Sequence, residues 1–343
     1  MNDESTEHNK IIKKVNCIPW VEKYRPKKLE NIIQQEEVIK VLKATLITGE
    51  LPHLLFFGPP GTGKTSTILA TALQLFGPVR IEERVIELNA SDDRGIGVVR
   101  NSIITFSKIA IGTADPNYPS PPFKIVILDE ADAMTPEAQA ALRKVMETTS
   151  GITRFCFICN YITQIIEPIS SRCMKFRFKP IDNSAIINKL KYISEREKMN
   201  IDELGIKKIA EISDGDVRRS IMILQNLKYL ASHKENITPS DITQITGGID
   251  ETKLKNLWKM CETGSVVDLR NISIQMCRDG YQIQNVLNHL KKKTFESKLL
   301  DKQKAVIILE LCATDKRLIE SSDEYLQILN MLLIINQVTK FKF

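Results

Sequence analysis

The sequence predicts an α/β domain with a parallel sheet and helices on both faces, followed by a small helical lid domain and a second all-helical domain. Three observations carry this prediction. Short apolar runs alternate with helix-like stretches up to Pro180, strand-like runs stop after Pro180, and a glycine-rich loop follows the first run. The 343 residues are enough for two or three domains of ordinary size.

Four short runs are apolar apart from Glu87 in the second, as is typical of central strands in a sheet that is covered on both faces. These runs are residues 54–57, 85–88, 125–128 and 155–158. Helical patterns occupy residues 64–76 and 135–148, and the second begins with Thr135-Pro136-Glu137, an N-cap signature. Alternating strands and helices predict a doubly wound α/β domain over residues 17–180.

The rest of the chain has helical spacing. Residues 1–16 are polar and charged, and we expect a disordered tail. Residues 181–249 show the spacing of amphipathic helices and predict a lid domain. Residues 250–343 carry periodic Leu, Ile, Val and Met, which predicts an all-helical collar domain.

Composition argues against a membrane protein, a secreted disulfide-rich protein and a zinc protein. No apolar stretch approaches 18 residues and no signal peptide opens the chain, so we expect a soluble intracellular protein. The seven cysteines are odd in number and scattered, which argues against a disulfide framework. Cys156 and Cys159 have CxxC spacing but lie in an apolar run without a second ligand pair, so we expect no metal site there. The net charge of +6 permits nucleic-acid contact without demonstrating it.

The loop from Gly58 to Thr65, with the sequence GPPGTGKT, matches the phosphate-binding pattern G-x-x-x-x-G-K-[ST]. Glycines let successive backbone N–H groups turn toward phosphate oxygens, and the following helix adds its positive end. Lys64 can reach the β- and γ-phosphates, and the Thr65 hydroxyl can bind Mg²⁺. A strand before the loop and a helix after it are the context that this motif requires.

Two acids complete the predicted site. Asp129 and Glu130 follow the apolar run 125–128, which would carry them to the carboxyl end of the sheet. We expect Asp129 to hold Mg²⁺ through a water, and Glu130 to orient or deprotonate the water that attacks ATP.

Four motifs occur in order along the chain: PWVEKYRP at residues 19–26, LNASDDRG at 88–95, DEAD at 129–132 and SRC at 171–173. Together they resemble the small subunits of replication factor C, the AAA+ sliding-clamp loader of eukaryotes and archaea. The resemblance covers nearly the whole chain from Pro19 and is most specific up to residue 180. Residues 117–132 and 155–160 most resemble the subtype called subunit 4 in animals and subunit 2 in budding yeast.

The resemblance implies roles for further residues. Arg172 matches the arginine finger that reaches the ATP site of the adjacent subunit. Asn160 matches the first sensor and Arg218 the second, while Val21, Tyr24 and Arg25 match a segment that helps enclose the nucleotide. The implied ATP contacts are Val21, Tyr24, Arg25, Gly58, Pro59, Pro60, Gly61, Thr62, Gly63, Lys64, Thr65, Ser66, Asn160 and Arg218.

The resemblance also implies cofactors and partners. ATP and Mg²⁺ would occupy the site, and the chain would join one large and three other small subunits in a heteropentamer. That ring would act in the nucleus on primer–template DNA and on the sliding clamp, proliferating cell nuclear antigen. Arg94, Arg100 and Lys108 would contact DNA phosphates without reading sequence.

Three alternatives stay open. The chain could be a scaffold subunit that binds nucleotide but barely hydrolyses it, although an intact Glu130 argues against this. It could belong to another AAA+ DNA machine, such as a branch-migration helicase or an origin-recognition subunit. It could also be shared with checkpoint or cohesion loaders that use a different large subunit.

Overall fold

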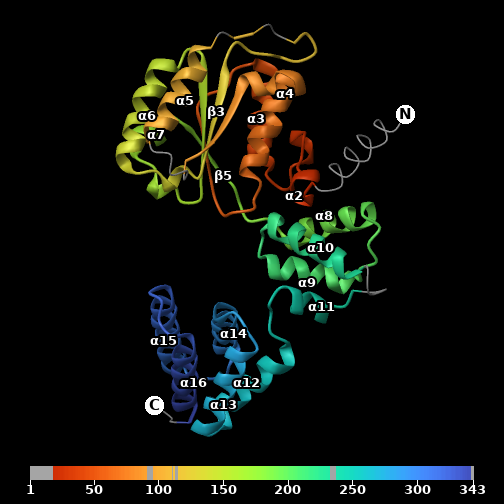
Figure 1. The fold of residues 1–343 in the computed structure, drawn as a ribbon, viewed down its shortest axis with the longest axis vertical. Helices are drawn as coiled ribbons and strands as arrows, with labels where there is room; N and C mark the ends of the chain where they lie inside the picture. Colours follow the sequence, from red (N-terminus) through yellow and green to blue (C-terminus); the bar gives the residue numbers. More distant parts are fainter. Residues whose placement is uncertain (1–17, 91–95, 110, 113–114, 232–236, 341–343) are drawn as a thin grey trace, which may run out of the picture. The chain divides into compact units, whose positions relative to one another are not determined.

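The computed structural model describes residues 18–90, 96–109, 111–112, 115–231 and 237–340 (Figure 1). The predicted tail at residues 1–16 therefore lies outside the described residues. The chain forms two compact units, Met1–Tyr229 and Leu230–Phe343. Each unit is built around its own buried apolar residues.

The first unit contains a five-stranded parallel sheet in the order β2-β3-β4-β1-β5. The strands are β1 (Leu54–Phe57), β2 (Val85–Asn89), β3 (Lys124–Asp129), β4 (Thr153–Cys159) and β5 (Met174–Arg177). All four predicted runs are strands. Strands β1, β3 and β4 are buried along nearly their whole length, because helices cover both faces of the sheet.

Side chains on opposite faces of the sheet belong to two separate hydrophobic cores. Phe56 and Ile127 pack with Leu42 and Phe76, which come from α3 (Glu36–Thr48) and α4 (Lys64–Arg84). Their strand neighbours face the other way and pack with Ile103, from α5 (Ile96–Lys108), and with side chains of α6 (Pro136–Thr149). The predicted layers, with helices on both faces of a parallel sheet, are confirmed.

Two predicted helix boundaries have clear local causes. Thr135 caps α6 by accepting a hydrogen bond from the Ala138 N–H at 3.3 Å, and Pro136 occupies the first turn. Helix α4 is interrupted at Gly77, whose φ of 77° and ψ of 167° are not helical, and Pro78 follows. The helical pattern that the sequence shows to residue 76 thus ends at a real break.

Short elements complete the sheet domain. These are α2 (Trp20–Lys23), η1 (Leu29–Asn31), η2 (Ala131–Ala133), η3 (Ile162–Gln164) and α7 (Glu167–Ser170). Helix α2 and η1 precede the sheet in the chain, whereas η2, η3 and α7 follow the carboxyl ends of β3 and β4.

Three helices follow the sheet within the first unit, as the sequence predicts for a lid. They are α8 (Asn183–Arg196), α9 (Glu203–Ser213) and α10 (Val217–Ala231). Their shared core includes Ile186, Leu190, Ile209 and Leu224, all fully buried. The N–H of Val217, at the start of α10, donates to the carbonyl of Gly61 at 3.3 Å, which joins this group to the glycine-rich loop.

The second unit is all-helical in its described residues. Its helices are α11 (Pro239–Ile245), α12 (Glu251–Thr263), α13 (Val266–Arg278), α14 (Ile283–Glu296), α15 (Asp301–Ile319) and α16 (Glu324–Lys340). Leu257, Leu290, Ile307 and Leu332 are among its buried core residues. The division of the chain at Leu230 places α11 in this unit, and the lid boundary expected at residue 249 stays a prediction. Among the described residues, no helix combines the length and apolarity needed to cross a bilayer.

Candidate nucleotide site

The glycine-rich loop joins β1 to the start of α4, where the sequence places it. Gly58 has a φ of +145°, and a Cβ at this position would lie 2.3 Å from the Phe178 carbonyl oxygen. Only glycine fits a backbone this close to its neighbour. Gly63 is left-handed at φ +92° and forms the N-cap of α4, so that the helix N-terminus opens directly into the loop. This arrangement suits an anionic phosphate.

Lys64 is held at the centre of the loop. Its Nζ donates to the carbonyls of Gly58 (2.7 Å) and Pro59 (2.9 Å) and to Oδ1 of Asn160 (3.0 Å). Burial lowers the pKa of Lys64; nearby Asp129 partly offsets this shift, and nearby Arg218 adds to it. An incoming polyphosphate would favour the charged lysine and reverse that shift.

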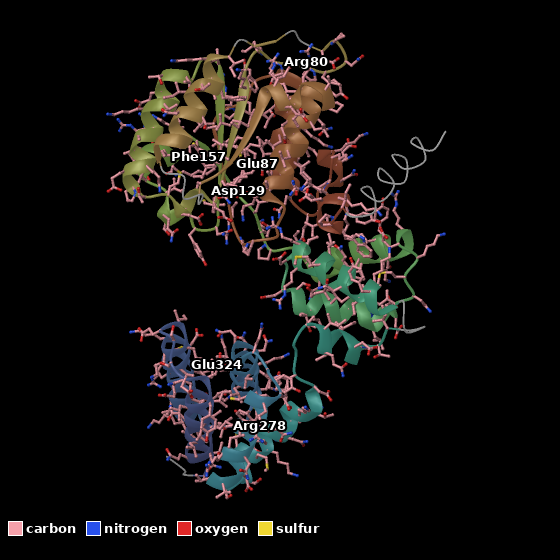
Figure 2. The ribbon with its side chains drawn as sticks, viewed as in Figure 1. Arg80, Glu87, Asp129, Phe157, Arg278 and Glu324 are labelled. Carbon is pink, nitrogen blue, oxygen red and sulfur yellow. The ribbon has the colours of Figure 1, made fainter. Side chains whose placement is uncertain are left out.

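Thr65 and Asp129 come from the two halves of the site and are in direct contact. The Thr65 hydroxyl donates to Oδ2 of Asp129 at 2.7 Å. Asp129 lies at the end of β3 (Figure 2), and its Oδ1 accepts the N–H of Glu130 at 2.9 Å. A hydroxyl and a carboxylate in contact are hard oxygen ligands, so these residues fit Mg²⁺.

Glu130 has the left-handed backbone conformation, with φ 53° and ψ 39°. This conformation is unfavourable for a residue with a Cβ, and such strain is common at functional sites. The turn places Glu130 in the lining of the cavity beside Asp129.

Asn160 follows β4 and is positioned by an acid that the sequence analysis gave no role. Oδ2 of Asp132 accepts the backbone N–H of Asn160 at 2.9 Å and that of Tyr161 at 3.2 Å. The side chain of Asn160 then reaches Lys64. Asp132 thus orients the loop after β4, and its place in the DEAD motif was the only signal in the sequence.

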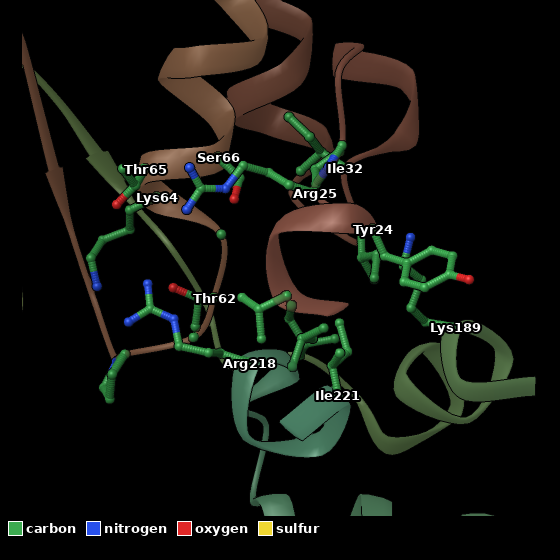
Figure 3. A pocket seen from close by; sticks show the side chains of 18 of the residues that line it. Tyr24, Arg25, Ile32, Thr62, Lys64, Thr65, Ser66, Lys189, Arg218 and Ile221 are labelled. Carbon is green, nitrogen blue, oxygen red and sulfur yellow. The ribbon is translucent and has the colours of Figure 1, made fainter. Parts of the chain in front are cut away.

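One cavity brings most of the predicted residues together (Figure 3). Lys64 and Arg218 lie at one end of it, and Tyr24 and Lys189 lie at the other. The predicted residues that line it are Val21, Tyr24, Arg25, Pro60, Gly61, Thr62, Gly63, Lys64, Thr65, Ser66, Asp129, Glu130, Asn160 and Arg218. Gly58 and Pro59 do not line the cavity, but their carbonyls accept hydrogen bonds from Lys64 and hold its side chain in place.

Most of the remaining lining is apolar and was not predicted from the sequence. The side chains involved are Ile32, Ile33, Ile181, Val217 and Ile221, with Lys189 among them. They come from the segment after α2, the start of the lid and α10. Apolar walls around a few polar groups are typical of sites for a flat organic ring. A single sequence cannot single these residues out, because core isoleucines have the same pattern.

Arg172 lies outside this cavity. Its guanidinium donates to the Pro168 carbonyl at 2.8 Å and pairs with Glu147 of α6 at 2.9 Å. The side chain is 43% exposed. An exposed arginine held by its own chain away from its own site can contact a second molecule.

The three residues predicted to contact DNA are only partly described. Arg94 lies outside the described residues, and Arg100 is described only through the backbone of α5. Lys108 is the last residue of α5 and is exposed.

Two protein families match this chain, one over the sheet domain and one over the C-terminal helices. The family described as "ATPase family associated with various cellular activities (AAA)" matches residues 54–181, and "Replication factor C C-terminal domain" matches residues 249–333. The human protein "Replication factor C subunit 4" is 46% identical, with 95% of this chain and 90% of that protein covered. Saccharomyces cerevisiae "Replication factor C subunit 2" is 43% identical, with 93% of each chain covered.

Solved structures of lower identity share the fold. The Thermotoga maritima RuvB Holliday junction branch migration motor aligns with a TM-score of 0.51 and 19% identity, covering 69% of this chain and 78% of that one. This likeness concerns the fold alone. It therefore gives no support to the helicase alternative.

Proposed function

This chain is an ATP-hydrolysing member of the replication factor C small-subunit family, and on that basis we propose that it is one subunit of a ring that loads a sliding clamp onto DNA. The cavity that joins Lys64, Thr65, Asp129, Glu130 and Arg218 is the observation that carries the proposal. It assembles both halves of an ATP site within the first unit. A scaffold that only binds nucleotide would not need the strained acid at position 130.

Each residue of the site has a proposed role in hydrolysis. Lys64 neutralises the β- and γ-phosphates, and Asn160 holds both Lys64 and the attacking water. Glu130 accepts a proton from that water or orients it. Thr65 and Asp129, which are in contact, would hold Mg²⁺, and the ion would neutralise charge that develops on the phosphates.

At the other end of the cavity, Val21, Tyr24 and Arg25 enclose the base and ribose together with the apolar wall. Arg218, carried on α10, reaches the phosphates and so reports the nucleotide state to the lid. ATP would favour the conformation in which the lid and the sheet domain both contact the nucleotide. Hydrolysis would remove that preference.

The working site extends beyond this chain. We propose that Arg172 completes the ATP site of the adjacent subunit and that a neighbour's arginine completes this one. Partners would be the other replication factor C subunits in a heteropentamer, the clamp proliferating cell nuclear antigen, and primer–template DNA in the nucleus. Arg94, Arg100 and Lys108 would contact DNA phosphates.

Substitution of Glu130 tests the proposal. In the assembled complex, Glu130→Gln should leave ATP binding within a few-fold of wild type and lower ATP turnover at this site by about 10² or more, because proton transfer loses its base. Phosphate release and clamp loading are the measurements. Glu137→Gln, an exposed acid on α6 outside the cavity, is the matched control and should change neither.

If Glu130→Gln left turnover and loading at wild-type levels, the scaffold alternative would be correct instead. Native mass spectrometry of the endogenous complex tests the assembly separately. One large and four small subunits are expected, and a homohexamer would contradict the proposed ring.

A further inference from the structure

A buried carboxylate fastens the N-terminal segment to the lid. Glu197 follows α8 as its C-cap, and its side chain is only 6% exposed. Its Oε1 accepts from Nζ of Lys23 at 2.5 Å and from the hydroxyl of Tyr24 at 2.6 Å. Its Oε2 accepts from Nζ of Lys228 at 2.6 Å. We call Glu197 and these three donors the clasp.

The clasp joins three elements that are far apart in the sequence. Lys23 and Tyr24 belong to the segment of α2, Glu197 to the end of α8, and Lys228 to α10. Two neighbouring contacts strengthen the same junction. The Trp20 N–H donates to Oε1 of Gln225 at 2.9 Å, and Nζ of Lys228 lies 5.1 Å from the centre of the Trp20 ring.

The charge of Glu197 is held by its donors. Burial alone would raise the pKa of this carboxyl, but the hydrogen bonds from Lys228, Lys23 and Tyr24 outweigh burial and hold the pKa at about 2. The carboxylate is therefore ionised at any physiological pH. Charge-assisted hydrogen bonds of this kind are stronger than neutral ones, and a buried ion that loses its partner is costly.

The position of the clasp connects it to the cavity. Tyr24 lines the cavity while its hydroxyl binds Glu197, and Val21 and Arg25 lie on the same short segment. Lys189, another lining residue, is on α8, the helix that ends at Glu197. The wall formed by this segment cannot leave the lid helices unless the bonds to Glu197 break.

We propose that Glu197 is a positioning residue that controls how long nucleotide stays bound, by keeping the N-terminal wall of the cavity closed against the lid. The inference rests on the proposed nucleotide site and adds its regulation. Release of ADP or ATP would require the clasp to open, whereas hydrolysis itself would not. None of the four clasp residues is among those proposed to contact the phosphates. A change in the clasp should therefore alter how long nucleotide stays bound without altering the rate of hydrolysis.

The test is the release rate of nucleotide from the full chain. Glu197→Gln keeps the size of the side chain but removes its charge. Release of a fluorescent ADP analogue, chased with excess ATP in a stopped-flow instrument, should accelerate about tenfold or more, because charge-assisted bonds to a buried group are lost. In the assembled complex, KM for ATP should rise while the single-turnover hydrolysis rate stays at the wild-type value.

A matched control lies on the same group of helices. Glu203 also accepts from a lysine, Lys191, at 2.6 Å, but its side chain is 58% exposed and it contacts no cavity residue named above. Glu203→Gln should leave the release rate unchanged. Lys228→Met removes the α10 donor to Glu197 and its contact with the Trp20 ring but keeps the other two donors, so it should give an intermediate acceleration; it replaces Glu197→Gln if that variant does not fold.

The outcomes separate the two proposals. If the wild-type chain bound no ATP analogue, or if Lys64→Ala bound it normally, the proposed nucleotide site would be wrong. If the wild type bound nucleotide and both clasp variants released it at the wild-type rate, only the role of Glu197 would be overturned. Amide exchange over residues 18–26 should be faster in Glu197→Gln, and equal exchange would also contradict the inference.

Discussion

At the scale of single residues, the site depends on backbone positions as much as on reactive side chains. Gly58 lets the chain pass next to Phe178, and Glu130 is held in a left-handed turn beside Asp129. Lys64 is fixed by acceptors from the loop and from Asn160, which follows β4. The sequence could predict the glycines and the lysine, because their spacing is a known pattern. It could not predict Asp132 as the acid that orients Asn160, because that contact joins η2 to the loop after β4.

The first prediction at this scale concerns Gly58. Gly58→Ala should lower the free energy of unfolding by at least about 2 kcal/mol, because it combines an unfavourable φ with a clash against backbone. Chemical denaturation measures the change. Gly63→Ala is the matched control from the same loop: its φ is +92° but a Cβ would meet nothing within 4 Å. It should cost less, and equal losses would show that the clash is relieved by movement of β5.

At the scale of elements, β1 and β4 are joined by more than their ladder. His53 lies just before β1, and its Nδ1 accepts the N–H of Phe155 in β4 at 3.1 Å. Burial, with a smaller contribution from Arg154, lowers the pKa of His53 to about 4. The strands themselves were predictable from continuous apolar runs. Their order was not, because β1 pairs with strands that come much later in the chain.

This imidazole predicts a pH dependence of stability. The pKa of His53 is lower in the folded protein than the usual 6.5, so the unfolded chain takes up the proton first. The stabilisation is complete above about pH 6.5 and is lost as the pH falls toward 4. Between pH 7.5 and pH 5 we expect a loss of about 1–2 kcal/mol from this group.

Urea unfolding at the two pH values measures the loss, and His53→Asn isolates the contribution of the imidazole. The asparagine amide can still accept from Phe155 but does not titrate. The variant should therefore lose less stability than the wild type on acidification. An identical loss in both proteins would assign the pH dependence to other groups.

At the scale of the whole molecule, we propose that the chain holds most of one ATP site and lends one residue, Arg172, to a neighbour's. Arg172 is exposed and bound to Glu147, away from its own cavity. Arg172→Ala should leave ATP affinity at its own site unchanged but lower hydrolysis at the neighbouring subunit's site by about 10³ or more. ATP turnover of the assembled complex, with nucleotide binding measured in parallel, checks both expectations.

Arg143→Ala is a matched control for this prediction, since Arg143 also pairs with Glu147, at 3.5 Å, with a side chain 39% exposed. Loss of either exposed ion pair should change stability by less than about 1 kcal/mol. A large drop in turnover with Arg143→Ala as well would mean that the position of Glu147, and not the arginine finger, matters. Unchanged turnover with Arg172→Ala would exclude the proposed finger.

The sequence by itself determined the fold class, an α/β domain followed by helical domains, together with four of the five strands of the described sheet, the glycine-rich loop and the acids at the end of β3. These features depend on local spacing and on the apolar or polar character of neighbouring residues. Only the tertiary structure decided the strand order, the apolar wall around Ile32 and Ile221, and the clasp at Glu197. The reason is physical: these contacts join residues up to some two hundred positions apart, and a single sequence carries no signal for which distant residues meet.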